Sequence, residues 1–249
     1  YKALHSVDKA LDLDITNWLY VSYTNRWRMF DNVISNVSSR VGGITFTLTP
    51  SQSADSLMLL NVNASSVRVV MNDSVAGVVY DQTIILSGNE GITNYYSYFF
   101  NTIADKKTTA AFLDMPSYPT ATITVTISSG SALTEVGEVV YGMKTIVGRT
   151  NYNTAIGIKS FSRKEVDEFG NVIVVKRRNS KYCEYDIDID NYKLSEIQRF
   201  FSDIDSVPCV FIGNETMDEL IVYGFYSEFK ATIAFPTVSK CSLRVEGLI

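Results

Sequence analysis

Alternating apolar and hydroxyl side chains dominate the first part of this 249-residue chain. Residues 44–49 read Ile-Thr-Phe-Thr-Leu-Thr, and residues 121–127 read Ala-Thr-Ile-Thr-Val-Thr-Ile. A period of two places the apolar side chains on one face of an extended strand and the hydroxyls on the other. An amphipathic helix would instead need apolar residues three to four positions apart. The chain is therefore expected to fold from half-buried β-strands.

Further strand-like segments follow, separated by residues that favour turns. These segments cover residues 57–62, 67–71, 78–86, 95–103, 108–113 and 135–142. The expected turns contain Asn72-Asp73, Ser87-Gly88-Asn89 and Ser128-Ser129-Gly130. Short strands at this spacing predict an all-β sandwich or barrel. Because no alternation of strands and helices is visible, we do not expect a doubly wound nucleotide-binding fold.

The second part of the chain repeats the strand pattern and adds one helix. Residues 185–190 alternate aromatic or aliphatic side chains with aspartates, which predicts a strand with one solvated acidic face. Apolar residues recur at helical spacing from 194 to 204, and Pro208 lies just past that segment. Strand-like segments cover residues 171–175, 210–212, 219–225, 229–235 and 241–245. The expected fold class is all-β with one helix, ending in a β-sandwich-plus-helix module.

Composition and charge exclude several classes of function. The net charge is −5, from 22 Lys and Arg against 27 Asp and Glu, which argues against nucleic-acid specificity because phosphate contacts need clustered excess cations. No apolar run reaches the roughly 18 residues that a membrane span requires. Two charged patches stand out as solvated or subunit-facing: the basic Lys176, Arg177, Arg178 and Lys181, and the acidic Glu184, Asp186, Asp188 and Asp190.

No catalytic, metal or cofactor site is expected. His5 is the only histidine, so any catalytic triad would depend on it alone. The acidic residues of segment 184–190 lie along one strand and cannot face each other across a cleft, as a glycosidase pair must. Residues 186–196 imitate a calcium loop but lack the glycine at its sixth position and the glutamate at its twelfth. The three cysteines are dispersed, which fits neither a zinc site nor a disulfide framework.

Three stretches resemble a family of bacteriophage tail structural proteins. Residues 24–31 read Thr-Asn-Arg-Trp-Arg-Met-Phe-Asp and are similar to that family's TNRWxMFD signature. Residues 162–171 are similar to its SRKExDxFGN element, and residues 223–248 to its YGFYxxF…CSLxxEGL close. The polar, glycine-bearing segment 148–151 is expected to be a domain boundary, and the first 30 residues differ from the rest in their aromatic content. With the resemblance, this gives three expected parts: an aromatic strip over residues 1–30, remnant of a carbohydrate-binding-like module; a jelly-roll-like β-sandwich over 31–148; and a tail-ring-like β-sandwich with one helix over 149–249.

The resemblance implies a structural role with no catalytic residue. The chain is expected in the virion tail, assembled in the host cytoplasm as a ring of copies that contacts other tail or portal-proximal proteins. The residues expected to dock or to contact other subunits are Arg26, Trp27, Phe30, Arg163, Lys164, Asp167, Glu168, Arg177, Arg178, Asp186 and Asp188. The alternative is a carbohydrate-binding tail module that contacts a host surface glycan. Tyr1 and Trp18 are its candidate sugar-stacking residues, because aromatic faces pack against the apolar faces of sugars.

Overall fold

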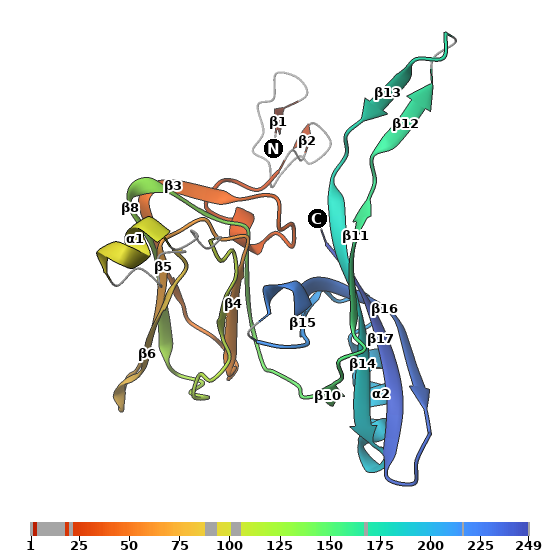
Figure 1. Ribbon diagram of the computed structural model, residues 1–249. Helices are drawn as coiled ribbons and strands as arrows, with labels where there is room; N and C mark the ends of the chain where they lie inside the picture. Colours follow the sequence, from red (N-terminus) through yellow and green to blue (C-terminus); the bar gives the residue numbers. More distant parts are fainter. Residues whose placement is uncertain are drawn as a thin grey trace.

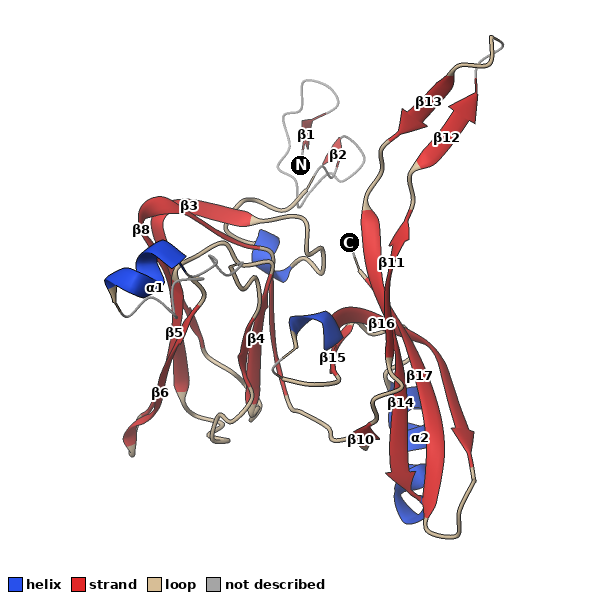
Figure 2. Ribbon diagram, viewed as in Figure 1, coloured by secondary structure: helices blue, strands red, loops and turns tan. Residues whose placement is uncertain are grey.

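The computed structural model describes residues 22–87, 94–100, 106–166, 169–215 and 217–248, and the backbone of two short paired strands, β1 (Lys2–Ala3) and β2 (Trp18–Leu19). The fold is all-β, as predicted, and the strand pairings of the described residues are antiparallel (Figure 2). The helix predicted over 194–204 is confirmed as α2 (Leu194–Asp203). Short 3-10 turns occur at η2 (Arg28–Phe30), η3 (Asn191–Lys193) and η4 (Asp218–Leu220).

Residues 22–142, called the first half below, form a sandwich of two sheets (Figure 1). One sheet has the order β3 (Ser38–Leu48), β8 (Thr122–Val136), β5 (Ser66–Asp73) and β6 (Gly77–Ile85). The other has the order β7 (Ala110–Phe112), β4 (Ser56–Leu60) and β9 (Glu138–Gly142). The first core lies between them, where the inward residues of the alternating strands, among them Val69, Ile123 and Val125, are fully buried.

Residues 149–248, the second half, form one six-stranded sheet with α2 packed on one face. Its order is β10 (Arg149–Thr150), β14 (Asn179–Asp190), β17 (Val238–Gly247), β16 (Ile221–Thr232) and β15 (Cys209–Ile212), and β11 (Ala155–Ser160) also pairs with β14. The alternation predicted for residues 185–190 is confirmed. Tyr185, Ile187 and Ile189 are buried against α2, whereas the aspartates point to the opposite face.

The two halves are held together by a third hydrophobic cluster, the joint cluster. Its buried members are Met58 and Leu60 of β4 and Ile221 and Tyr223 of β16. The intervening side chains serve other cores, since Leu57 and Leu59 lie in the first core and Val222 packs against α2. Strand β4 and the first four residues of β16, 221–224, are therefore buried on both faces, which explains why residues 57–60 form an unbroken apolar run.

Three of the predicted assignments are wrong. Residues 219–225 and 229–235, expected as two strands, fall largely on the single strand β16. Residues 95–103 were expected to form a strand, but Tyr95–Phe100 is the helix α1. This run has no strict polar–apolar alternation, and a helix places Tyr96 over Phe100 four positions later, with ring centroids 4.8 Å apart. The turn expected at residues 128–130 is instead a kink inside β8, where Gly130 has φ +64° and the pairing with β3 shifts register between Val41 and Gly43.

Candidate interaction surface

A long two-stranded arm extends from the sheet of the second half (Figure 1). Strands β11 and β14 begin it, and β12 (Arg163–Val166) and β13 (Val172–Val175) form its outer part. We call residues 155–182 the arm. The backbone N–H of Phe161 donates to the Arg178 carbonyl and that of Arg177 to Ser162 Oγ, so the two strands stay linked between the paired segments.

The arm carries apolar side chains that the other described residues leave uncovered. The register places Val166 opposite Val172 and Lys164 opposite Val174, so the three valines share one face of the ribbon. All three are exposed, and Val174 retains 67% of its accessible surface. Nearer the sheet, Ile156 is also exposed and lies opposite the buried Cys183, on the face that α2 covers further along. The arm is thus an apolar surface that no described residue covers.

Positive charge accompanies these apolar side chains. The exposed cations of the arm are Lys159, Arg163, Lys164, Lys176, Arg177, Arg178 and Lys181. Arg163 pairs with Glu165 at 3.2 Å, and Lys159 Nζ lies 3.8 Å from the Glu246 carboxylate. Arg178 Nη1 donates to Ser35 Oγ of the first half, which ties the base of the arm to a residue 143 positions away in the chain. Two of the predicted docking residues, Arg163 and Arg178, therefore have partners inside the same chain.

The predicted acidic residues line the face of β14 opposite α2. Glu184 pairs with Arg244 of β17 at 3.5 Å, and Asp188 lies opposite Lys240 in the register. Asp186 accepts a hydrogen bond from Asn153 Nδ2 at 3.4 Å. Asp186 and Asp188 are half-buried, and Asp188 Oδ1 has no hydrogen-bond partner among the described residues. This face is a charged surface that its own neighbouring strand only partly neutralises.

The predicted aromatic anchor stacks outward from the first core. Phe30 packs edge-on against Phe46 with ring centroids 5.9 Å apart, and Trp27 lies 6.3 Å from Phe30. The Arg26 guanidinium lies 5.6 Å from the Trp27 ring centroid, a distance at which a cation is attracted to the ring face. Trp27 remains 55% exposed, so this stack is fixed at its inner end and open at its outer end.

The structure does not describe the side chains of four predicted site residues. Tyr1, Asp167 and Glu168 lie outside the described residues, and of Trp18 only the backbone in β2 is described. The sequence did not predict the exposed aromatic helix α1, and none of its residues was among the predicted site residues. Tyr95, Tyr96, Phe99 and Phe100 are each at least 72% exposed on this helix. The signal was present as six residues with five aromatic rings, but it was assigned to a strand.

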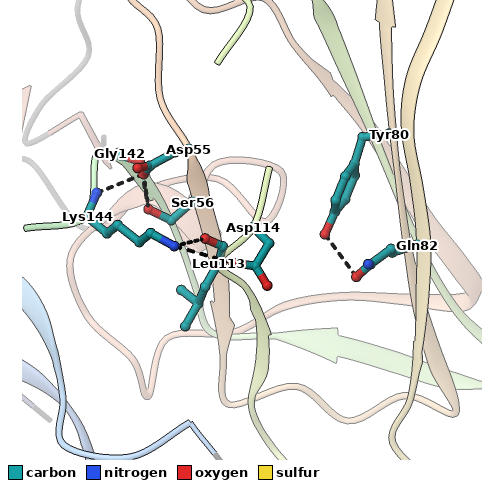
Figure 3. A network of polar contacts seen from close by, with 8 residues as sticks. All are labelled: Asp55, Ser56, Tyr80, Gln82, Leu113, Asp114, Gly142 and Lys144. Carbon is teal, nitrogen blue, oxygen red and sulfur yellow. Dashed lines mark hydrogen bonds and ion pairs between the residues drawn. The ribbon is translucent and has the colours of Figure 1, made fainter. Parts of the chain in front are cut away.

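A cavity of about 520 Å³ lies between the halves, lined by β4, β9, β15 and the connection over residues 143–148. A polar network fastens this connection at its start (Figure 3). The Lys144 backbone N–H donates to Asp55 Oδ1 at 2.8 Å, and its Nζ donates to the Leu113 carbonyl at 2.6 Å. Burial alone would raise the pKa of Asp55, but the hydrogen bonds from Lys144 and Ser56 bring it below its usual value. The network fixes the direction in which the chain leaves β9.

No protein-family model matches the chain, and no curated protein matches it either. Among the described residues, no group of three or more His, Cys, Asp or Glu side chains could hold a metal ion. Within the same residues, the helices are too short or too polar to cross a membrane.

Proposed function

We propose that this chain is a non-enzymatic structural component of a bacteriophage virion tail, which assembles as a ring and contacts other tail proteins. The observation that carries the proposal is the arm, whose apolar side chains and free strand edges are not covered by any of the described residues. A two-stranded ribbon is marginally stable on its own in water, and open strand edges pair readily with another chain. The resemblance to tail structural proteins supplies the virion context.

Charge complementarity favours another copy of the same chain as the partner. The arm is basic, and the open face of β14 carries Asp186 and Asp188, so Arg177 of one copy can meet the acidic face of the next. Contact between two different surfaces of identical subunits is head-to-tail, and it closes into a ring when the rotation between neighbours allows. Such charged pairs would set the register of neighbours more than their affinity. Trp27 with its neighbours Arg26 and Phe30 offers a second contact, to adjacent tail proteins.

The assembly is tested by the size of the particle in solution. We expect the wild-type chain to sediment well above its monomer mass of 27.8 kDa and to form rings in negative-stain images. Val174→Asp should return it to a monomer, because a carboxylate in the buried contact would lose its hydration. Val78→Asp is the matched control, since Val78 of β6 is 63% exposed on a strand outside the arm.

Reversing a charge on the arm tests whether charged pairs align neighbouring copies. Arg177→Glu should weaken assembly, and the effect should grow at low ionic strength, where repulsion is less screened. Arg178 is left unchanged because it bonds Ser35 within the chain. A wild-type chain that remains monomeric at high concentration, or variants that assemble normally, would count against the proposal. Imaging of whole particles would then locate the chain within the tail.

The exposed aromatic rings of α1 favour a second candidate function, a carbohydrate-binding tail module that contacts the host surface. Tyr95, Tyr96, Phe99 and Phe100 project from the connection between β6 and β7, where their faces can stack against sugar rings. A glycan array should then show binding that Tyr96→Ala removes. A signal no higher than background across the array would reject this alternative.

A further inference from the structure

One buried carboxyl group lies where the two halves of the chain meet. Glu138 is the first residue of β9 and is only 3% exposed, next to the joint cluster of Met58, Leu60, Ile221 and Tyr223. It pairs with Leu60 in the register of β4 and β9, so its backbone is fixed by the sheet. A carboxyl group in such a place is costly unless it is neutral or fully hydrogen-bonded.

The surroundings of Glu138 satisfy only part of its hydrogen-bonding capacity. The backbone N–H of Asn32 donates to the carboxylate, but Oε2 has no hydrogen-bond partner among the described residues. Tyr223 reaches across from the second half, and its hydroxyl donates to Asn32 Oδ1 at 2.9 Å. Glu138 therefore adjoins a hydrogen bond that joins the halves directly.

The charged and titratable groups around Glu138 oppose its ionisation. Asp31, at the end of η2, is the neighbouring carboxylate, and its oxygens are held by the Val33 N–H and by Asn36 Nδ2. Tyr223 faces Glu138 from β16 and is itself kept neutral, since burial and the nearby Glu138 charge raise the pKa of its hydroxyl. None of the ion pairs among the described residues includes Glu138. Burial, followed by the Asp31 charge, raises the pKa of Glu138 to about 7.

We propose that Glu138 is a pH-sensitive latch between the two halves: its protonated carboxyl lets them pack together, and its ionised carboxylate favours their separation. The geometry supplies the reason, because separation at the joint would bring the orphan oxygen to water, whereas docking keeps it from water. The latch is a property of the single chain and does not depend on the assembly proposed above.

The direction of the effect follows from linkage. In the separated state Glu138 would titrate near its ordinary value of 4.5, and in the docked state near 7. The docked state thus holds one proton more than the separated state between these values. The equilibrium constant for separation should rise by about tenfold per pH unit across that window and level off above it. Lowering the pH through the window tightens the joint.

Cys209 provides a reporter of separation. It lies on β15, is half-buried and lines the cavity between the halves, whereas Cys183 and Cys241 are buried in the core under α2. We would measure iodoacetamide labelling of each cysteine by mass spectrometry from pH 5 to pH 8, in wild type and in Glu138→Gln. The ratio of the two Cys209 rates at each pH removes the intrinsic pH dependence of the thiol, because both proteins share it.

The latch predicts that the wild-type rate relative to Glu138→Gln rises with pH up to about 7 and then levels, while labelling of Cys183 and Cys241 stays slow. A ratio that does not change with pH would overturn the proposal, as would equal labelling of all three cysteines, which indicates global unfolding. If Glu138→Gln fails to fold, Asp31→Asn serves instead. The Cys209 rate of Asp31→Asn is then divided by that of wild type at each pH. Removing the neighbouring charge lowers the pKa of Glu138, so this ratio should fall as the pH rises toward 7, and a ratio independent of pH would again reject the latch.

Discussion

The joint cluster predicts that the two halves unfold together, and that two substitutions on one strand uncouple them. Met58 and Leu60 alternate along β4 with Leu57 and Leu59, so Met58→Ala with Leu60→Ala removes apolar contact between the halves and spares the first core. Both side chains are at least 94% buried, and truncating such a side chain costs about 2–4 kcal/mol. Because the two sites are neighbours, the pair should cost somewhat less than the sum.

The chain carries its own probes for each half. Trp27 packs against Phe30 beside the first core, so in a Trp18→Phe background, which leaves Trp27 as the only tryptophan, fluorescence follows the first half. All three cysteines lie between residues 183 and 241, so pulsed thiol labelling follows the second half. In urea, wild type should give one midpoint by both probes, whereas the double variant should give two separate midpoints at lower urea.

Leu59→Ala is the matched control, because it truncates a fully buried side chain of the same strand toward the first core. It should lower stability by a similar amount while the two midpoints stay together. The reasoning is refuted if the double variant also keeps coincident midpoints, or if it loses no more than the about 0.5 kcal/mol typical of a surface substitution. Either result would mean that the joint cluster does not couple the halves.

Two further predictions concern groups within each half. Phe201→Ala should destabilise the second half by about 3–5 kcal/mol in the thiol-monitored urea transition, because Phe201 is buried and stacks on Phe229 with centroids 4.5 Å apart; a loss below 1 kcal/mol would contradict it. In the first half, backbone N–H donors of the following turn and then the Thr120 hydroxyl hold the pKa of Asp73 below 3.8. Wild type should therefore melt at a higher temperature than Asp73→Asn at neutral pH, and this difference should shrink as the pH falls below 3.8 and the carboxylate is protonated. A difference that persists in acid would show that it does not come from the ionised carboxylate.

Local periodicity predicted the strands and the helix, because burial on one face imposes a repeat that a single segment displays. Residues 121–127 and 185–190 show the period of a strand, and residues 194–204 show the period of a helix. The run at residues 57–60 predicted a strand but not its partners. An unbroken apolar strand is buried on both faces, yet nothing in the run says that one face meets β16, more than 150 residues further along the chain.

The misassigned segments lack a decisive repeat. Five aromatic rings in six residues suit either a strand or a helix, so residues 95–100 could not be assigned by propensity alone. The glycine at position 130 signalled a change of direction, but a kink within paired strands and a turn between strands use the same residue. Only the pairing of β3 with β8 on both sides of the kink distinguishes them.

The position of the arm in the fold could not be predicted from local sequence patterns either. The charges at residues 163–178 were recognisable in the sequence, but their placement on a projecting ribbon depends on where β14 leaves the sheet. The link between Arg178 and Ser35 likewise joins residues too far apart for any local pattern to reveal. Residues 163–166 are all exposed, so β12 has no buried face from which an alternating pattern could arise in the sequence.

Substitutions in the joint cluster and on the arm should have different effects on the stability of the monomer. At the joint cluster, apolar side chains from both halves are buried within a single molecule, so substitutions there change the stability of the monomer. On the arm, Val166, Val172 and Val174 are exposed in the single molecule. Substitutions there should therefore change the free energy of unfolding of the monomer very little. A loss of assembly without a change in the urea midpoint is therefore the signature of an arm contact. Loss of both together would indicate that the arm acts through the fold and not through a neighbouring copy.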